Sequence, residues 1–367
     1  SDKSGYYSAL DADSEGEEGL YYTWKLQELE DILSKDEMDL AKVYFNLKPQ
    51  SNWENQRNIL AQDISVEELA EKFQYTLTET KQHLDVIKTK LKTQRNKRIK
   101  PGLDNKLIIA HNAMLVKAFV KSYQATSDES YKIMALDLMQ KLIKNSINAD
   151  YSVNRLMDKS KPQGFLDDYA FMIEALIFAY EISFEINYLK EAEKLVDYTL
   201  THFYDDQQQL FYYADKNSQL IARKIEFSDN VIPSSNAVMA ENLWRLGHLI
   251  SKDKFVNVTK SMLKKVQHLY KKFSLYFANW HKLNIAVLKG QIDVAVTGPN
   301  AVKNTHELQK YFWPYVNFCG GHSENLPQLL HKIKTNTDQI FICQNKTCSE
   351  PSNDIAQGVK AIKKLIN

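Results

Sequence analysis

The chain has 367 residues, of which 44% are apolar and 25% charged, a composition typical of a globular protein and unlike that of a disordered chain. Its 47 Lys and Arg residues nearly balance 46 Asp and Glu residues, so no strong net charge attracts nucleic acid or an anionic membrane, and we expect binding to neither. With 11 Gly and 8 Pro, the chain has too few turn-forming residues for a many-stranded β-protein. The composition therefore predicts mostly helix.

An acidic run, residues 11–19, lies near the amino terminus between two aromatic runs, residues 6–8 and 21–24. We expect the two aromatic runs to pair as a hairpin or to form two loop strands. The acidic run is either a solvated tip or a loop that brings Asp11, Asp13 or Glu15 into a site as general acid or base. Its opening resembles an EF-hand loop. The twelfth position is Tyr22 where that loop requires Glu, which excludes a calcium site of that kind.

The central part of the chain alternates between two types of predicted helix. Helices apolar on nearly every face are expected near residues 104–123, 166–183 and 234–250, and each is followed by a helix with a single apolar face. An all-round apolar helix must be covered on all sides, so these pairs predict inner and outer helices of an α/α toroid. A fourth pair near residues 274–288 and a less regular one at 24–45 leave the ring incomplete, and we expect the chain to begin within a longer protein.

Two further segments have local signals. Thr76 is expected to cap a long polar helix that runs to about Arg95. Strands are expected at residues 292–297, 315–318 and 339–343, with helices at 302–311 and 354–366. The predicted fold class is therefore mainly α: a partial α/α toroid region over residues 1–290, including the acidic run, and a small mixed α/β appendage over 291–367 that packs on it.

Polar residues gather at the amino ends of the predicted inner helices. In a ring of parallel inner helices these ends open on one face, so they predict a common funnel. The candidate catalytic residues are Asp168 and His111, together with the acidic run, and the candidate substrate-binding residues are Asn112, Tyr169, Asp229, Ser235 and Asn236. Asp168 and Ser234 could instead serve only as helix caps. His111 either points into a cavity or makes a hydrogen bond in the core.

The three cysteines are Cys319, Cys343 and Cys348, a small odd number that favours a reducing compartment, and we expect a cytoplasmic protein. Cys343 and Cys348 with Cys319 and His322 could complete a zinc site, but buried or neighbouring thiols are the preferred interpretation, so we predict no metal. No glycine-rich nucleotide-binding spacing is present, and we expect no cofactor.

Several motifs together resemble one known family. They are Gly5 to Gly19 followed by Tyr22-Thr23-Trp24, Asn52-Trp53-Glu54 with Asn58-Ile59-Leu60, Gly164 to Ala170, Ile232 to Asn236, and Cys343 to Cys348 with Pro351. This set is similar to the thioredoxin-domain-containing family related to spermatogenesis-associated protein 20, and it spans almost the whole chain. Where that family commonly has a Trp-Asn-Gly-Leu-like run, this chain has Ala110-His111-Asn112-Ala113-Met114, so only the Asn matches.

The resemblance implies a longer parent protein, with an amino-terminal thioredoxin-like domain followed by a toroid similar to N-acylglucosamine 2-epimerase and the six-hairpin glycosidases. The leading hypothesis is a carbohydrate- or polyol-binding toroid that acts as an isomerase, epimerase or hydrolase by acid/base catalysis. The alternative is a noncatalytic scaffold or interaction module for the thioredoxin-like domain. Because an incomplete ring exposes apolar faces, we also expect a large apolar patch, and with it self-association or poor stability of the chain.

Overall fold

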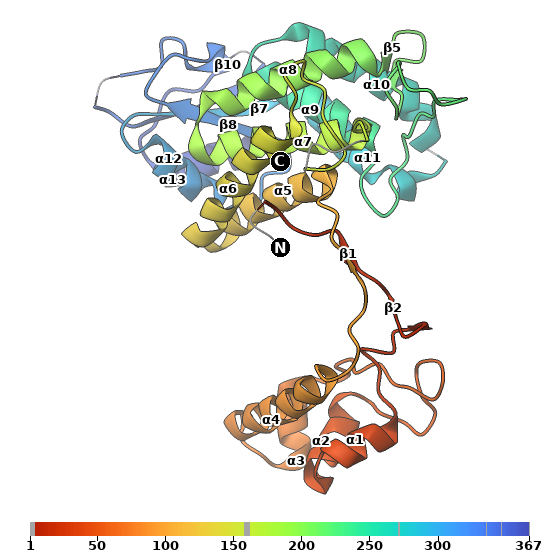
Figure 1. The fold of residues 1–367 in the computed structure, drawn as a ribbon. Helices are drawn as coiled ribbons and strands as arrows, with labels where there is room; N and C mark the ends of the chain where they lie inside the picture. Colours follow the sequence, from red (N-terminus) through yellow and green to blue (C-terminus); the bar gives the residue numbers. More distant parts are fainter. Residues whose placement is uncertain (1–3, 158–161, 271, 335, 346, 367) are drawn as a thin grey trace. The chain divides into compact units, whose positions relative to one another are not determined.

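The computed structural model describes residues 4–157, 162–270, 272–334, 336–345 and 347–366 (Figure 1). The chain divides into two compact units, one formed by Tyr7–Asn105 and the other by the residues just before Tyr7 together with those from Lys106 onward. We expected residues 1–290 to form one region. Residues 7–105 instead form a unit of their own because they bury a separate apolar core that includes Trp24, Leu29 and Leu84.

The smaller unit consists of four helices and two short strand pairs. The helices are α1 (Leu26–Ile32), α2 (Lys35–Tyr44), α3 (Val66–Phe73) and α4 (Leu77–Arg95). Thr76 accepts a hydrogen bond from the Glu79 backbone N–H while the Glu79 carboxylate accepts one from the Thr76 N–H, which confirms the predicted helix start.

The aromatic runs do not form the expected hairpin. The acidic run itself folds back, with β2 (Asp13–Ser14) antiparallel to β3 (Glu17–Glu18). Glu15 and Gly16 have φ angles of 56° and 82°, the left-handed conformation that a two-residue hairpin turn requires. The preceding strand β1 (Ala9–Leu10) pairs with β4 (Leu103–Asp104). Short polar turn residues therefore determined the pairing, whereas Tyr21 and Trp24 are buried in the unit.

The larger unit contains three helical hairpins. Their helices are α5 (Ile109–Thr126), α6 (Glu129–Ser146), α7 (Leu166–Ser183), α8 (Ile186–His202), α9 (Ser235–Leu249) and α10 (Asp253–Tyr270). Helix α7 packs against both α5 and α9, and each of these three packs against the helix that follows it. All residues of α7 from Leu166 to Ile182 are buried. The predicted inner and outer helices of a partial α/α toroid are confirmed.

The rest of this unit follows the third hairpin. Helix α11 (Ala278–Lys289), preceded by a short 3-10 turn at Ser274–Phe277, contacts both α9 and α10. Two-residue strands β5 (Tyr204–Asp205) and β6 (Leu210–Phe211) pair in the connection between α8 and α9. Large apolar side chains are exposed near α11, at Val231, Phe273, Leu275 and Tyr276.

The carboxy-terminal part contains a four-stranded mixed sheet in the order β10-β9-β7-β8. Its strands are β7 (Ile292–Thr297), β8 (Val316–Gly321), β9 (Gln339–Gln344) and β10 (Thr347–Cys348), with helices α12 (Ala301–Gln309) and α13 (Ile355–Ile366) and a 3-10 turn at Pro327–Leu329. Strands β7 and β8 are parallel because α12 carries the chain between them. Strand β8 also contacts α7 and α9, so this sheet is packed on the toroid helices within one compact unit.

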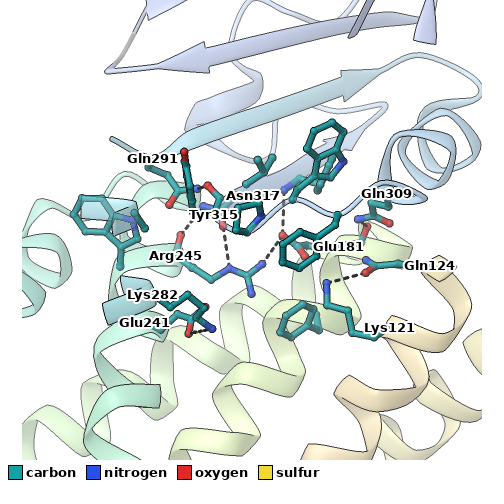
Figure 2. Close-up of a pocket in the computed structure, with 18 of the residues that line it drawn as sticks. Lys121, Gln124, Glu181, Glu241, Arg245, Lys282, Gln291, Gln309, Tyr315 and Asn317 are labelled. Carbon is teal, nitrogen blue, oxygen red and sulfur yellow. Dashed lines mark hydrogen bonds and ion pairs between the residues drawn. The ribbon is translucent and has the colours of Figure 1, made fainter. Parts of the chain in front are cut away.

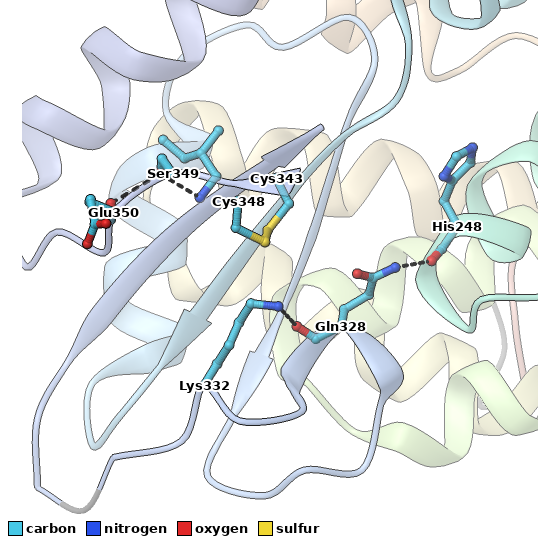
Figure 3. Close-up of a disulfide and its surroundings, with 8 residues drawn as sticks. His248, Gln328, Lys332, Cys343, Cys348, Ser349 and Glu350 are labelled. Carbon is cyan, nitrogen blue, oxygen red and sulfur yellow. Dashed lines mark hydrogen bonds between the residues drawn. A yellow bond between two sulfur atoms is a disulfide. The ribbon is translucent and has the colours of Figure 1, made fainter. Parts of the chain in front are cut away.

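A disulfide joins Cys343 on β9 to Cys348 on β10, which are directly opposite each other in the antiparallel pair (Figure 3). We expected two thiols at these positions. Among the described residues, no group of three or more His, Cys, Asp or Glu side chains is arranged to hold a metal ion. In the same described part, no helix is both long and apolar enough to span a membrane.

Candidate functional site

Asp168, one of the candidate catalytic residues, lies fully buried at the amino end of α7, where its carboxylate is hydrogen-bonded to the backbone. Its carboxylate accepts hydrogen bonds from the Phe165 N–H at 3.0 Å and the Ala110 N–H at 3.2 Å, and Arg155 pairs with it at 3.0 Å. Arg155 also contacts Asp167. Burial and the adjacent Asp167 carboxylate raise the pKa of Asp168 to about 7, although Arg155 acts to lower it.

The other residues predicted at the amino ends also make local hydrogen bonds. The Tyr169 hydroxyl accepts from the Val153 N–H. The Asn236 amide contacts the backbone of Phe211 through both its oxygen and its nitrogen. The Ser235 hydroxyl donates to Glu226 at 2.6 Å.

Asp229 accepts from the N–H groups of Ser234 and Asn279, and so links the amino ends of α9 and α11. The Asn112 amide accepts from the Tyr6 N–H and donates to the Tyr6 carbonyl, which holds the amino-terminal segment on α5. His111 is exposed on α5 and does not lie among the buried side chains of that helix. Ligand binding by these residues stays a prediction.

Asp11, Asp13 and Glu15 are exposed and belong to the smaller unit, whereas the other candidates belong to the larger one. Their contribution to a funnel beside Asp168 stays a prediction as well. Two cavities in the described part of the structure, one between the inner helices and β8 and one beside Tyr204 and Lys254, are lined by no residue of the predicted set.

The more enclosed of these cavities lies at the opposite ends of the inner helices and has a volume of about 230 Å³. We call it the carboxyl-end cavity. Side chains from the carboxy-terminal halves of α5, α7 and α9 face the segment that leads into β8 (Figure 2). Residues 309 and 311–318 contribute amide and aromatic side chains, and α11 adds Lys282. Segments distant in sequence therefore meet at one cavity.

A buried ion pair forms part of the cavity wall. Arg245 on α9 contacts Glu181 on α7 at 2.7 Å, and its Nε donates to Asn317 Oδ1 at 3.1 Å. Glu181 also accepts from the Phe318 N–H at 3.1 Å, so one carboxylate joins both helices to β8. Burial disfavours the Arg245 charge, but the neighbouring Glu181 and Glu241 carboxylates more than offset it and raise the pKa of Arg245.

Three cationic side chains surround the ring of Phe178. The Arg245 guanidinium carbon lies 4.5 Å from the ring centroid, and the Nζ atoms of Lys121 and Lys117 lie at 4.8 and 5.4 Å. Lys117 pairs with Glu174 at 2.5 Å, and Lys282 pairs with Glu241 at 2.6 Å. Such a wall has charge, hydrogen-bonding groups and aromatic faces, the combination that fixes polar ligands in protein cavities.

Three lining residues carry a buried polar atom that lacks a hydrogen-bond partner. These atoms are Trp244 Nε1, Gln291 Oε1 and Gln309 Oε1. The amide nitrogens of the two glutamines donate to backbone carbonyls, at Ile292 and Tyr315 for Gln291 and at Glu181 for Gln309. An unpaired buried polar group costs about 1–3 kcal/mol, so a ligand toward which these side chains turn, and which supplies the missing partners, recovers this free energy.

Asp293 on β7 lies behind this wall and accepts a hydrogen bond from Asn317 Nδ2 at 3.0 Å. Burial raises the pKa of Asp293 to about 7, although the hydrogen bond from Asn317 lowers it. Because the folded-state pKa is raised, the stability that Asp293 contributes is fully present below the pKa of an unfolded Asp and is lost as the pH rises through about 7.

We therefore expect the free energy of unfolding to fall with rising pH more steeply in the wild type than in Asp293→Asn. The difference is about 1.4 kcal/mol per pH unit between the unfolded and folded pKa values. Urea unfolding at about pH 5.5 and about pH 7 measures it. Asp137→Asn, at an exposed position on α6, is the control. Equal pH dependence in wild type and Asp293→Asn would contradict this assignment.

Sequence analysis missed the carboxyl-end cavity, although a signal was present. Glu174 and Glu181 lie within a helix that is otherwise almost entirely apolar. Carboxylates in a fully covered helix require cationic partners, and these are Lys117 and Arg245. The relevant pattern was therefore charge inside the inner helices, rather than polarity at their amino ends.

No family model matches the chain. It is 25% identical to human spermatogenesis-associated protein 20, over 95% of this chain and 51% of that protein. The mouse protein of the same name is 28% identical over 69% of this chain and 37% of its own length. An uncharacterized protein of Caenorhabditis elegans is 25% identical over 68% of this chain and 38% of that protein. The predicted resemblance is confirmed, and the chain spans about half or less of the length of these relatives.

Solved structures similar to the chain include carbohydrate-active enzymes. A GH76 α-mannanase from Bacteroides thetaiotaomicron has a TM-score of 0.39 at 14% identity and covers 45% of each chain. A sugar epimerase from a ruminal bacterium has a TM-score of 0.38 at 13% identity, over 46% of each chain. Cellobiose 2-epimerase from Bacillus thermoamylovorans has a TM-score of 0.37 at 11% identity, over 44% of this chain and 45% of that one.

Proposed function

We propose that this chain binds a carbohydrate or polyol in the carboxyl-end cavity. The observation that carries the proposal is the set of three unpaired polar atoms in the lining. A polyol hydroxyl both donates and accepts hydrogen bonds, so it can donate to Gln291 Oε1 or Gln309 Oε1 and accept from Trp244 Nε1. The aromatic residues of the 311–318 segment add apolar faces on which the carbon skeleton of a sugar can pack.

The proposed reaction class is acid/base isomerisation, epimerisation or hydrolysis, which requires proton-transfer groups at the bound sugar. Lys121 is the best candidate in the cavity, because burial lowers its pKa to about 8 and brings proton exchange close to neutral pH. Glu181 and Glu241 are already paired with Arg245 and Lys282, so their proposed role is to position those cations and not to transfer protons.

Binding is tested by isothermal titration of the full chain with a panel of neutral sugars and sugar alcohols. Trp244→Phe removes the unpaired N–H and keeps an aromatic ring, so we expect affinity to fall about fivefold to tenfold with little loss of stability. The control is Trp53→Phe, which removes an indole from the smaller unit. If no member of the panel binds, or if both variants bind as the wild type does, the carboxyl-end cavity is not the ligand site.

A second candidate function is an interaction module. Val231, Phe273, Leu275 and Tyr276 expose apolar side chains close to α11, and the backbone N–H of Asp229 donates to the Tyr276 carbonyl, which brings the two segments together. The proposed occupants are a second copy of the chain or the thioredoxin-like domain of a longer parent protein.

For self-association, we expect sedimentation of the wild type to show a concentration-dependent dimer. Leu275→Ser should shift it toward the monomer, whereas Ile133→Ser, at an exposed apolar residue on α6, should leave it unchanged. A wild type that stays monomeric across the concentration range would contradict self-association.

The cytoplasm remains the proposed compartment, on the basis of the small odd number of cysteines. The Cys343–Cys348 disulfide favours the opposite assignment. Alkylation of freshly extracted protein followed by mass spectrometry decides between them: both cysteines alkylated supports a reducing compartment, and an intact disulfide contradicts it.

A further inference from the structure

The charges of the carboxyl-end cavity are not all balanced. Lys117, Arg245 and Lys282 each pair with a carboxylate, at Glu174, Glu181 and Glu241 respectively. Lys121 is different: within the described residues it forms no ion pair, and its Nζ donates to the uncharged Gln124 Oε1 at 2.9 Å. The wall therefore carries one more cation than it has carboxylates to pair with.

Lys121 is also accessible. The residue is exposed overall, but its Nζ lies among the lining groups, 4.8 Å from the Phe178 ring centroid and hydrogen-bonded to Gln124, and this surrounding protein desolvates the ammonium. Figure 2 shows Lys121 and Gln124 on the same side of the site as Glu181.

We propose that the ligand of this cavity carries an anionic group, a carboxylate or a phosphate, that pairs with Lys121, so that the preferred ligand is a sugar acid or a sugar phosphate. This inference rests on the proposed carbohydrate-binding function. The hydroxyl groups of such a ligand meet the unpaired amide and indole atoms, and its anion supplies the counter-charge that Lys121 lacks.

The groups around Lys121 determine its response to pH. Helix α5 contributes Lys117 and Gln124, α7 contributes Glu174 and Glu181, and α9 contributes Arg245. The segment before β8 adds amide and aromatic side chains, including Tyr311 and Tyr315. Burial of the ammonium is the main cause that lowers the pKa of Lys121 to about 8. The Arg245 and Lys117 charges also lower this pKa, and the Glu181 and Glu174 carboxylates act to raise it.

Because the ammonium form binds the anion, affinity for an anionic ligand is expected to fall as the pH rises above about 8, by up to tenfold per pH unit. A neutral polyol should show no such dependence. Lys121→Arg keeps the charge at every accessible pH, so it should retain anion preference and lose this pH dependence.

The test is isothermal titration of the full chain with matched ligands: glucitol against gluconate, and glucose against glucuronate and glucose 6-phosphate. Acetate and inorganic phosphate report the anion alone. We expect at least one anionic sugar to bind about tenfold more tightly than its neutral counterpart. Lys121→Met should abolish that preference, whereas Lys144→Met, at an exposed position on α6, should leave it intact.

The outcomes separate the two proposals. Neutral binding without anion preference overturns the anionic-ligand inference and leaves the carbohydrate site in place. No binding of any sugar overturns the proposed function itself. Phosphate or acetate binding as tightly as the matching sugar indicates a simple anion site and overturns the inference. Preference for gluconate and glucuronate identifies a carboxylate, and preference for glucose 6-phosphate identifies a phosphate.

Discussion

Replacing Arg245 by methionine is expected to destabilise the larger unit by about 3–5 kcal/mol, because it leaves the buried Glu181 carboxylate without its counter-ion. The side chain of Glu181 is 3% exposed and that of Arg245 is 11% exposed, so water compensates little for the lost partner. The change also removes the Arg245 bond to Asn317, through which α9 is joined to β8. Urea unfolding of the full chain measures this loss.

The control is Lys141→Met, which breaks an ion pair of equal length, 2.7 Å to Asp137, at an exposed site on α6. Its expected cost is below about 0.5 kcal/mol. The double variant Arg245→Met with Glu181→Gln should recover part of the loss, because no unpaired charge remains buried. A cost for Arg245→Met as small as that of the control would show that the pair does not hold the sheet to the helices.

Asp168→Ala is expected to be similarly damaging, at about 3–5 kcal/mol. The change leaves the N–H groups of Phe165 and Ala110 without an acceptor and removes one partner of Arg155. It also opens a void at a fully buried position. Thermal or urea unfolding measures the loss.

Asp150→Ala, which removes an exposed turn carboxylate that accepts from Ser152, is the comparison and should cost about 1 kcal/mol or less. If Asp168 instead acts on a ligand, as its place among the candidate catalytic residues implies, its replacement should abolish sugar binding and leave stability unchanged. Full stability of Asp168→Ala together with abolished sugar binding would therefore favour a direct ligand role over the capping role.

The fold could be predicted where one signal dominated. Helix α7 has seventeen consecutive buried residues, of which all but two Asp and two Glu are apolar, and a helix that is apolar on nearly every face has no stable position except inside. Strand β7, Ile292–Thr297, matched its prediction because a short β-branched run buried on both faces is distinctive. The predicted Thr76 cap is confirmed because the capping box of Thr76 and Glu79 is a signal within four consecutive residues.

The site was harder to predict because its geometry is not local. Polar residues at helix amino ends can bind a ligand or can hydrogen-bond nearby backbone groups. Asp168 and Asn236 accept hydrogen bonds from the backbone N–H groups of Phe165 and Phe211. The carboxyl-end cavity combines residues of five helices, α5, α7, α9, α11 and α12, with the segment before β8. No spacing in the sequence indicates that Lys121 lacks a carboxylate partner while Lys117, four residues earlier, has one. Pairing across helices depends on rotation and register, which a single sequence does not reveal.

The most direct test of the central claim is a crystal structure of the full chain soaked with the best-binding sugar of the titration panel. We predict density for the sugar in the carboxyl-end cavity, in hydrogen-bond contact with Gln309 or Gln291 and close to Lys121 and Trp244. Density at the amino ends of the inner helices beside Asp168 and Asn236, with the carboxyl-end cavity empty, would contradict the claim.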